Sequence, residues 1–199
     1  IFEFIYLGQY YDYLRSHEIR SLNGDLVKSY EECEIGNFFY LNGIAYEYER
    51  RYEFDTATTQ YRQYEPDFFL TDYGIYIEHF GIDREGNTPE FVDRDAYNEE
   101  IEWKRQLHQQ NKTALVETFS FEKSEGILLS ALKEKLTEQE VAFKPIPPEA
   151  VFEQLNQLGA VDTFSLLVGT FLNHFKSGQR NIKEIREETR GHKEETRFL

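Results

Sequence analysis

The chain is poor in the residues that build disulfides, metal clusters and membrane spans. Its 199 residues include a single cysteine, Cys33, and no methionine. One cysteine excludes an internal disulfide and a cysteine-rich zinc site and is typical of a reducing compartment, so we expect a cytoplasmic protein. No apolar run reaches the ~18 residues of a membrane-spanning helix and no basic-then-apolar leader is present, so we expect no membrane partner. Because the chain begins at Ile1 and lacks methionine altogether, we expect an excised piece of a larger protein.

Basic residues are also scarce. Lys and Arg number 22 against 37 Asp and Glu, which gives a net charge of −15. Phosphate binding depends on Lys and Arg, so this balance excludes a surface that attracts DNA everywhere, but it is compatible with a local basic track. Aromatic residues, by contrast, are abundant, with 17 Phe and 14 Tyr. They suit a β-rich core, and they also suit stacking on nucleic-acid bases.

Hydrophobic spacing predicts one α/β domain between two helical segments. A chain of this length can bury one substantial core, or one domain with elements of a second. Ser29 and Glu32 form a capping box that begins a helix, and the period-two alternation from Ile44 to Phe54 indicates a strand. The expected elements are helices at 1–20, 30–41, 93–110 and 124–138, strands at 44–54, 61–70, 75–80, 114–120 and 141–143, a proline-rich linker at 144–148, and helices at 148–158, 161–177 and 180–190.

This order predicts an α/β fold with a mixed β-sheet flanked by helices and with additional helices at both ends. The hairpin strands come first, and a helix then crosses over to a later strand. We therefore expect an N-terminal helical segment at 1–23, an α/β domain at 24–143 and a further helical segment at 144–199.

Two acidic residues stand out within the expected hairpin. Asp67 and Glu78 lie in short strand-like runs that are separated by the tight turn Thr71-Asp72-Tyr73-Gly74. Such a hairpin can place both carboxylates on one face of a sheet, where hard oxygen ligands hold a divalent cation. Alternatively, Asp67 belongs to a Pro-Asp turn and Glu78 to a solvated strand face. His79 alternates onto the opposite face, and we expect it to pack or to form hydrogen bonds.

A third carboxylate and a lysine can complete this site. Glu32 precedes Ile35 and Phe39 on one helix face, so it can reach the acidic pair, act only in the capping box, or do both. Lys104 continues a helical stripe that directs it toward the sheet and an acidic partner, unless it extends past the apolar residues to water. The members of that stripe are Tyr97, Ile101, Lys104 and His108. We expect Glu31 to be solvated.

The sequence resembles a known family over residues from about 20 to 180. An acid on an opening helix, a Pro-Asp strand, a Glu strand and a following helix form the layout of the PD-(D/E)XK nuclease-like fold, with its restriction-endonuclease-like core. Several longer strings are similar to a segment of UvrD-like superfamily 1 DNA helicases of the helicase IV type. These strings are Val27-Lys28-Ser29-Tyr30-Glu31-Glu32, Ile35-Gly36-Asn37-Phe38, Asn42-Gly43-Ile44, Tyr46-Glu47-Tyr48-Glu49, Tyr64-Glu65-Pro66-Asp67-Phe68, Tyr76-Ile77-Glu78-His79-Phe80-Gly81-Ile82-Asp83, Trp103-Lys104-Arg105-Gln106-Leu107-His108 and Thr170-Phe171-Leu172-Asn173-His174-Phe175-Lys176-Ser177.

The resemblance implies a larger protein that couples ATP hydrolysis to DNA unwinding and contacts DNA. These 199 residues contain no G-x-x-x-x-G-K-[ST] phosphate loop, so ATP would be bound elsewhere in that protein. The family motif places a lysine where Phe80 stands, and Lys104 is the available substitute.

Three functions remain open. An active site would use Glu32, Asp67 and Glu78 to hold Mg²⁺ for phosphodiester hydrolysis, with Lys104 assisting electrostatically. An inactive nuclease fold would position DNA or act as a spacer between helicase domains. A protein-interaction module would use the aromatic N-terminal helix as its docking surface.

Overall fold

The computed structural model describes residues 18–59 and 62–177. The chain divides into two compact units, one ending at Pro147 and one beginning at Pro148. The helix expected at 180–190 and nearly all of the one expected at 1–20 lie outside the described residues. Residues 18–20 are not helical: Arg20 forms an isolated antiparallel bridge with Leu26.

The first unit contains a four-stranded mixed sheet, which confirms the predicted α/β class. Its strands are β1 (Tyr46–Tyr48), β2 (Phe68–Leu70), β3 (Ile75–Phe80) and β4 (Ala114–Phe119), in the order β1-β2-β3-β4. The first two pairings are antiparallel, and β4 runs parallel to β3.

Strands β1 and β2 are much shorter than predicted. Glu49 adopts a left-handed conformation with φ of 48°, which ends β1 after three residues. Pro66 has no backbone N–H to donate to a ladder, and β2 begins two residues later. The described residues between these two points lie outside the sheet strands and are irregular, although part of this segment alternates like a strand in sequence.

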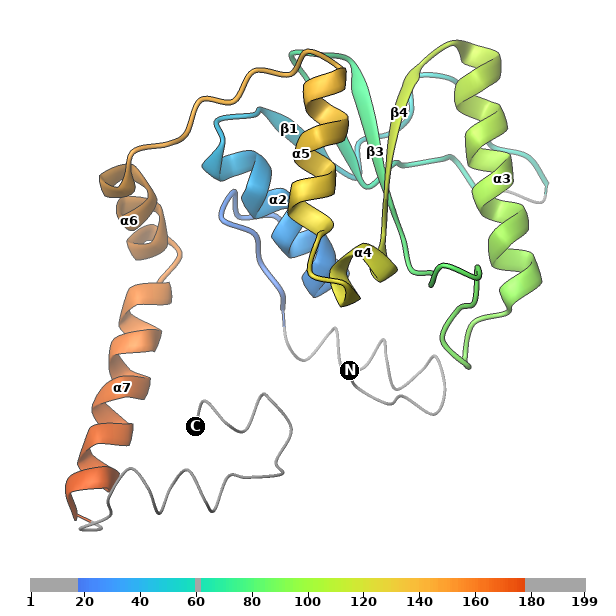
Figure 1. Ribbon diagram of the computed structural model, residues 1–199. Helices are drawn as coiled ribbons and strands as arrows, with labels where there is room; N and C mark the ends of the chain where they lie inside the picture. Colours follow the sequence, from blue (N-terminus) through green and yellow to red (C-terminus); the bar gives the residue numbers. More distant parts are fainter. Residues whose placement is uncertain (1–17, 60–61, 178–199) are drawn as a thin grey trace. The chain divides into compact units, whose positions relative to one another are not determined.

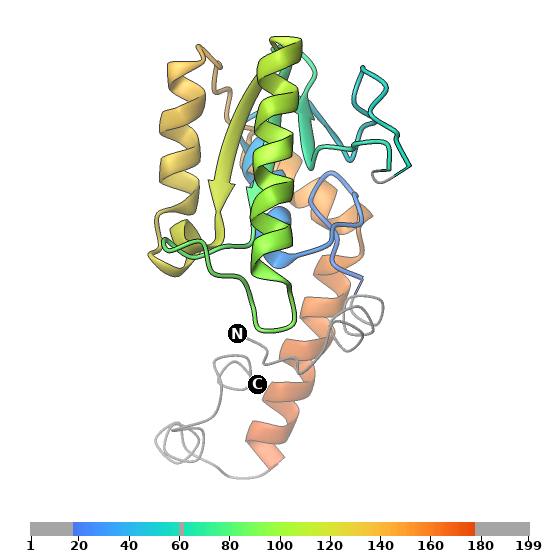
Figure 2. The same cartoon turned by 90° about the vertical axis from the view of Figure 1, so that its right-hand side faces the viewer.

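Helices cover both faces of the sheet (Figures 1 and 2). Helices α2 (Tyr30–Leu41) and α5 (Leu128–Glu138) pack on one face, where the largest apolar core includes Phe39, Ile77 and Leu132. Helix α3 (Arg94–Asn111) packs on the other face against a smaller aromatic cluster. The alternation of side chains along β3 therefore decides which helix layer each residue meets.

Two predicted elements near the end of this unit differ from the structure. The helix expected at 124–138 begins later, as α5 at Leu128, because Gly126 turns the chain with φ of 73° after a separate short helix, α4 (Ser120–Ser124). The strand expected at 141–143 does not form. The N–H of Ala142 donates instead to the Tyr73 hydroxyl, and that of Lys144 to the carbonyl of Asn42.

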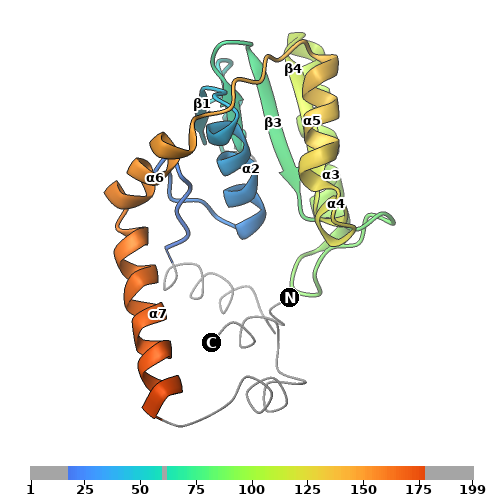
Figure 3. The same ribbon diagram turned by 60° about the vertical axis from the view of Figure 1, so that its left-hand side comes forward.

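The second unit consists, in its described part, of helices α6 (Pro148–Gln157) and α7 (Ala160–Ser177) (Figure 3). A short turn joins them through Gly159, which has φ of 71°. Both helices carry exposed large apolar side chains, among them Phe152 and Phe164. Across the ranges that the structure describes, no helix is both long enough and apolar enough to cross a membrane.

Candidate active site on the α3 face of the sheet

The register of the β2–β3 hairpin places the two acidic residues opposite each other. Phe68 pairs with Ile77, so the same antiparallel register extended by one residue brings Asp67 opposite Glu78. Phe68 and Ile77 belong to the core under α2 and α5. Their neighbours Asp67 and Glu78 therefore face α3. The backbone N–H of His79 donates to Asp67 Oδ2 at 2.7 Å, which fixes the aspartate at the start of β2.

Lys104 of α3 reaches Glu78 directly. Its Nζ lies 2.8 Å from Glu78 Oε2, and the two side chains are 17% and 1% exposed. Glu100, one turn earlier on α3, is a second and weaker partner with Oε1 at 3.4 Å. A carboxylate as buried as Glu78 requires a cation or several donors, and the Lys104 ammonium supplies the cation.

Two aromatic rings complete the surroundings of this ammonium. Lys104 Nζ lies 5.7 Å from the ring centroid of Tyr64 and 5.6 Å from that of Phe80, both within the range of a cation–π interaction. Phe80, the last residue of β3, is itself buried.

Burial and charge perturb the pKa values of all three groups. Burial raises the pKa of Asp67 well above its ordinary range, and the nearby carboxylates of Glu78 and Glu32 raise it further. Burial also raises the pKa of Glu78, against the opposing effect of Lys104. For Lys104 burial lowers the pKa, but Glu78 and Asp67 outweigh it and raise the pKa above its usual value. Strongly perturbed titratable groups in contact are typical of functional sites.

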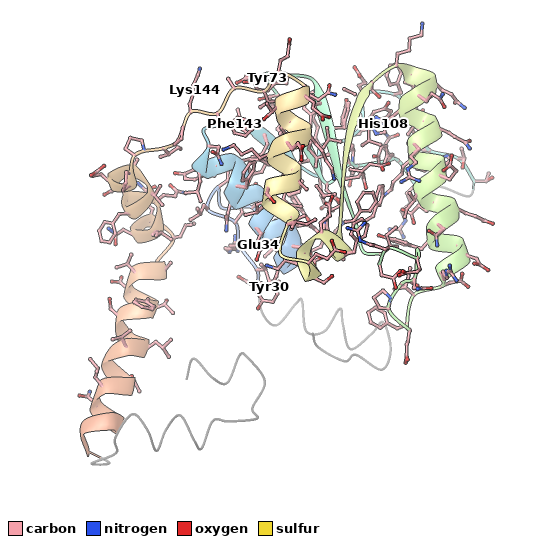
Figure 4. All side chains as sticks on the ribbon, viewed as in Figure 1. Tyr30, Glu34, Tyr73, His108, Phe143 and Lys144 are labelled. Atoms are coloured by element: carbon pink, nitrogen blue, oxygen red, sulfur yellow. The ribbon has the colours of Figure 1, made fainter. Side chains whose placement is uncertain are left out.

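A chain of hydrogen bonds leads from Glu78 into the aromatic cluster. The Tyr64 hydroxyl donates to Glu78 Oε1 at 2.7 Å and lies 3.1 Å from His108 Nε2. His108 Nδ1 is 2.7 Å from the Thr113 hydroxyl, which is 2.7 Å from that of Tyr52. His108 is 2% exposed, and burial lowers its pKa to about 4, so the imidazole is neutral. Figure 4 shows this histidine on the α3 side of β4.

Glu32 lies near this site but is held by other partners. Its carboxylate accepts hydrogen bonds from the Ser29 hydroxyl at 3.0 Å, the Lys28 N–H at 3.2 Å and the Tyr48 hydroxyl at 2.5 Å. The Ser29 side chain in turn accepts from the Glu32 N–H, so the serine cap of α2 is present. The Glu32 carboxylate also contributes to the raised pKa of Asp67.

A second network lies on the α2 face. It confirms the prediction that His79 forms hydrogen bonds on the face opposite Glu78, but sequence reasoning missed the partners of this histidine. Glu31 Oε2 is 2.7 Å from His79 Nε2 and also accepts from the Ser120 hydroxyl at 2.5 Å, so the expectation that Glu31 is solvated was wrong. The Thr118 hydroxyl lies 2.9 Å from His79 Nδ1 and 3.2 Å from the Glu78 carbonyl oxygen. These bonds join α2, β3 and β4 directly behind the acidic pair.

Tyr64, which contacts Glu78 directly, is a further residue that the sequence analysis did not assign to the site. The one available signal was its position three residues before Asp67 on the same run. That run is irregular rather than a strand, so period-two alternation gave no direction for the tyrosine.

The donor set suits a hydrated hard cation. Mg²⁺ commonly takes one or two protein carboxylates as ligands and keeps several of its water molecules. Asp67 and Glu78 can provide these carboxylates. In residues 18–59 and 62–177, no group of three or more acidic, histidine or cysteine side chains is placed to hold a metal ion. A three-carboxylate site that includes Glu32 stays a prediction, and it requires this side chain to leave its present partners.

Comparison with protein-family models, with curated proteins and with solved structures finds no match to this chain.

Proposed function

We propose that this chain carries a nuclease-like, DNA-contacting accessory domain of a larger cytoplasmic, ATP-dependent superfamily 1 DNA helicase, and that its site hydrolyses phosphodiester bonds with Mg²⁺. The observation that carries the proposal is the convergence of Asp67, Glu78 and Lys104 between the β2–β3 hairpin and α3. The order α2-β1-β2-β3-α3-β4 around a mixed sheet supports a restriction-endonuclease-like core. ATP binding and DNA unwinding belong in this proposal to the larger protein.

Asp67 and Glu78 would hold the metal ion, with Glu32 as the further predicted ligand. Bound there, Mg²⁺ would polarise the scissile phosphate and activate a water molecule for in-line attack. Asp67 is only partly buried, so it is the more accessible of the two acids. Its backbone partner His79 keeps one oxygen fixed at 2.7 Å.

Lys104 would offset the negative charge that develops on the phosphate. The Lys104 side chain is 17% exposed and has Glu100 as a second partner, so its ammonium can turn from Glu78 toward an anion. Positioned cations of this kind typically contribute about 10²–10³ in rate.

The proposal is tested by a cleavage assay on single- and double-stranded DNA with Mg²⁺ and with Mn²⁺. We expect metal-dependent cleavage by the wild-type chain and a loss of about 10²–10³ in rate for Asp67→Asn. Asp72→Asn is the matched control, because it makes the same chemical change at an exposed residue of the hairpin turn. Wild-type cleavage no faster than that of Asp67→Asn would refute the catalytic proposal.

One observation favours a second function, that of a catalytically inactive nuclease-fold spacer. Glu78 is 1% exposed and both of its oxygens are already bonded, one to Lys104 and one to Tyr64. Such a closed ion pair serves stability and leaves little room for a substrate. In this case the wild-type chain cleaves neither substrate, and Asp67→Asn binds DNA as the wild type does. The protein-interaction alternative depends on the N-terminal aromatic segment, which lies outside the described residues.

A further inference from the structure

The hydrogen bonds behind Glu78 can have only one direction. A carboxylate carries no proton, so the Tyr64 hydroxyl must donate to Glu78 Oε1 across 2.7 Å. That hydroxyl has a single proton, which is now used. The contact of 3.1 Å between Tyr64 and His108 Nε2 is therefore a bond in which the imidazole N–H donates to the phenol oxygen.

The same reasoning continues to the end of the chain of bonds. A neutral imidazole protonated at Nε2 has a bare Nδ1, so the Thr113 hydroxyl must donate to it across 2.7 Å. The Thr113 oxygen then accepts from the Tyr52 hydroxyl, also at 2.7 Å. The burial of His108 excludes the charged form of the imidazole. In that form Nδ1 would also carry a proton and would donate to the Thr113 oxygen instead of accepting from its hydroxyl.

Local backbone geometry holds this arrangement in place. Lys112 ends α3 in a left-handed conformation with φ of 57°, and the Thr113 N–H returns to the carbonyl of His108 at 3.0 Å. This turn brings the threonine hydroxyl back against the ring of the histidine one turn earlier. The rings of Tyr52 and Tyr64 contact the imidazole edge to face, with centroids 5.0 and 5.6 Å away.

We propose that Tyr52, Thr113, His108 and Tyr64 form a one-way donor relay that positions the Glu78 carboxylate for metal binding. Bonds aligned in one sense polarise one another, so each donor strengthens the next. The relay holds Oε1 from behind and leaves Oε2 directed at the Lys104 side of the site. The part played by Glu78 as a metal ligand rests on the proposed function, whereas the direction of the relay does not.

Nitrogen-15 NMR of the imidazole tests the direction of the relay without any metal or substrate. We expect His108, assigned by its loss in His108→Gln, to be protonated at Nε2 and bare at Nδ1 at neutral pH. In Thr113→Val the Nδ1 resonance should move, because its donor is gone, and Thr113→Ser should restore it. A proton on Nδ1 of the wild-type histidine, or an Nδ1 resonance that Thr113→Val leaves unchanged, would overturn the relay.

Binding of Mn²⁺ alone, measured by electron paramagnetic resonance, tests the positioning role. Removing an outer partner of a metal ligand typically weakens affinity about 10–100-fold. We expect Tyr64→Phe to weaken Mn²⁺ binding at least about tenfold, Thr113→Val to weaken it less, and Thr113→Ser to leave it within about twofold. Tyr73→Phe is the matched control, since it removes a tyrosine hydroxyl that binds Ala142 at a distance from this site (Figure 4).

The two failures are distinguishable. If the wild type binds Mn²⁺ no better than Asp67→Asn does, the proposed function fails, and the NMR result alone decides the relay. If the wild type binds Mn²⁺ and Tyr64→Phe binds it equally well, the positioning role is overturned while the proposed function stands. Should Tyr64→Phe fail to fold, an unchanged affinity in Thr113→Val overturns the positioning role in its place.

Discussion

Replacing Lys104 with methionine, which keeps the length of the side chain and removes its charge, should destabilise the first unit. The change leaves Glu78 as a carboxylate that is 1% exposed and has lost its cation. Breaking a buried ion pair at one partner costs about 3–5 kcal/mol. Because Lys104 is 17% exposed and Tyr64 still donates to Glu78, we expect the lower end, about 3 kcal/mol. For a unit of this size that corresponds to a fall in Tm of about 6–12 °C.

The dependence on pH gives this prediction its sign. Lys104 is the main influence that lowers the pKa of Glu78, so without it that pKa rises further above the unfolded value. A carboxyl with a raised folded pKa loses stability as the pH rises through that pKa. The deficit of Lys104→Met should therefore be largest near pH 8 and shrink toward pH 5.

Urea unfolding followed by the fluorescence of Trp103 measures this deficit. It is the single tryptophan of the chain, and its ring lies 5.8 Å from that of Tyr64. The double variant with Glu78→Gln should recover about 1–3 kcal/mol of the loss, since neither charge is then left unpaired. Wild-type stability in Lys104→Met at pH 8, or an equal deficit at both pH values, would show that the pair is not a buried electrostatic interaction.

Three other substitutions have defined outcomes in the same unfolding assay. Asp67→Asn should raise the free energy of unfolding at pH 7 by about 1–3 kcal/mol, because burial and the Glu78 and Glu32 carboxylates raise the pKa of Asp67. The gain should disappear below about pH 4, and a loss of stability at pH 7 would contradict the prediction. Glu31→Gln should instead lower the free energy of unfolding, by about 1 kcal/mol at pH 7 and by less as the pH falls toward 4. The reason is that burial raises the pKa of Glu31, but His79 and Ser120 outweigh burial and lower that pKa overall. Gly43→Ala should cost at least about 3 kcal/mol of stability, because Gly43 has φ of 64° and a Cβ there would lie 2.5 Å from the Lys144 carbonyl oxygen. The control Gly74→Ala, with φ of 66° and open space around the new Cβ, should cost only about 1–2 kcal/mol, and equal losses of stability would refute the steric argument.

Local patterns in the sequence were sufficient to predict the contacts that adjacent elements make. The stripe on α3 directs Lys104 at the sheet because Ile101 and His108 are buried on the same helix face, and its ammonium is 2.8 Å from Glu78. The hairpin spacing likewise predicts Asp67 opposite Glu78, as the register has them. Whether these residues bind metal or act in catalysis stays a prediction.

The remaining contacts depend on parts of the chain that no short window contains. Glu31 and His79 are 48 residues apart, so only the packing of α2 on the sheet brings them together. The left-handed Glu49 ends β1 although its neighbours alternate like a strand, since tertiary context overrides weak strand propensity. Tyr64 lies in the irregular segment that results, where periodicity gives no side-chain direction.

The alternation along β3 restricts how the length of this hairpin can change in evolution. Glu78 and His79 are adjacent in sequence but serve different networks on opposite faces. Inserting or deleting one residue between Ile75 and Glu78 would exchange these faces, so that the glutamate would meet α2 and the histidine would meet Lys104. A change of two residues preserves the faces. Among related sequences, length variation should therefore accumulate in the turn around Gly74, and within the strand only even-numbered changes should be tolerated.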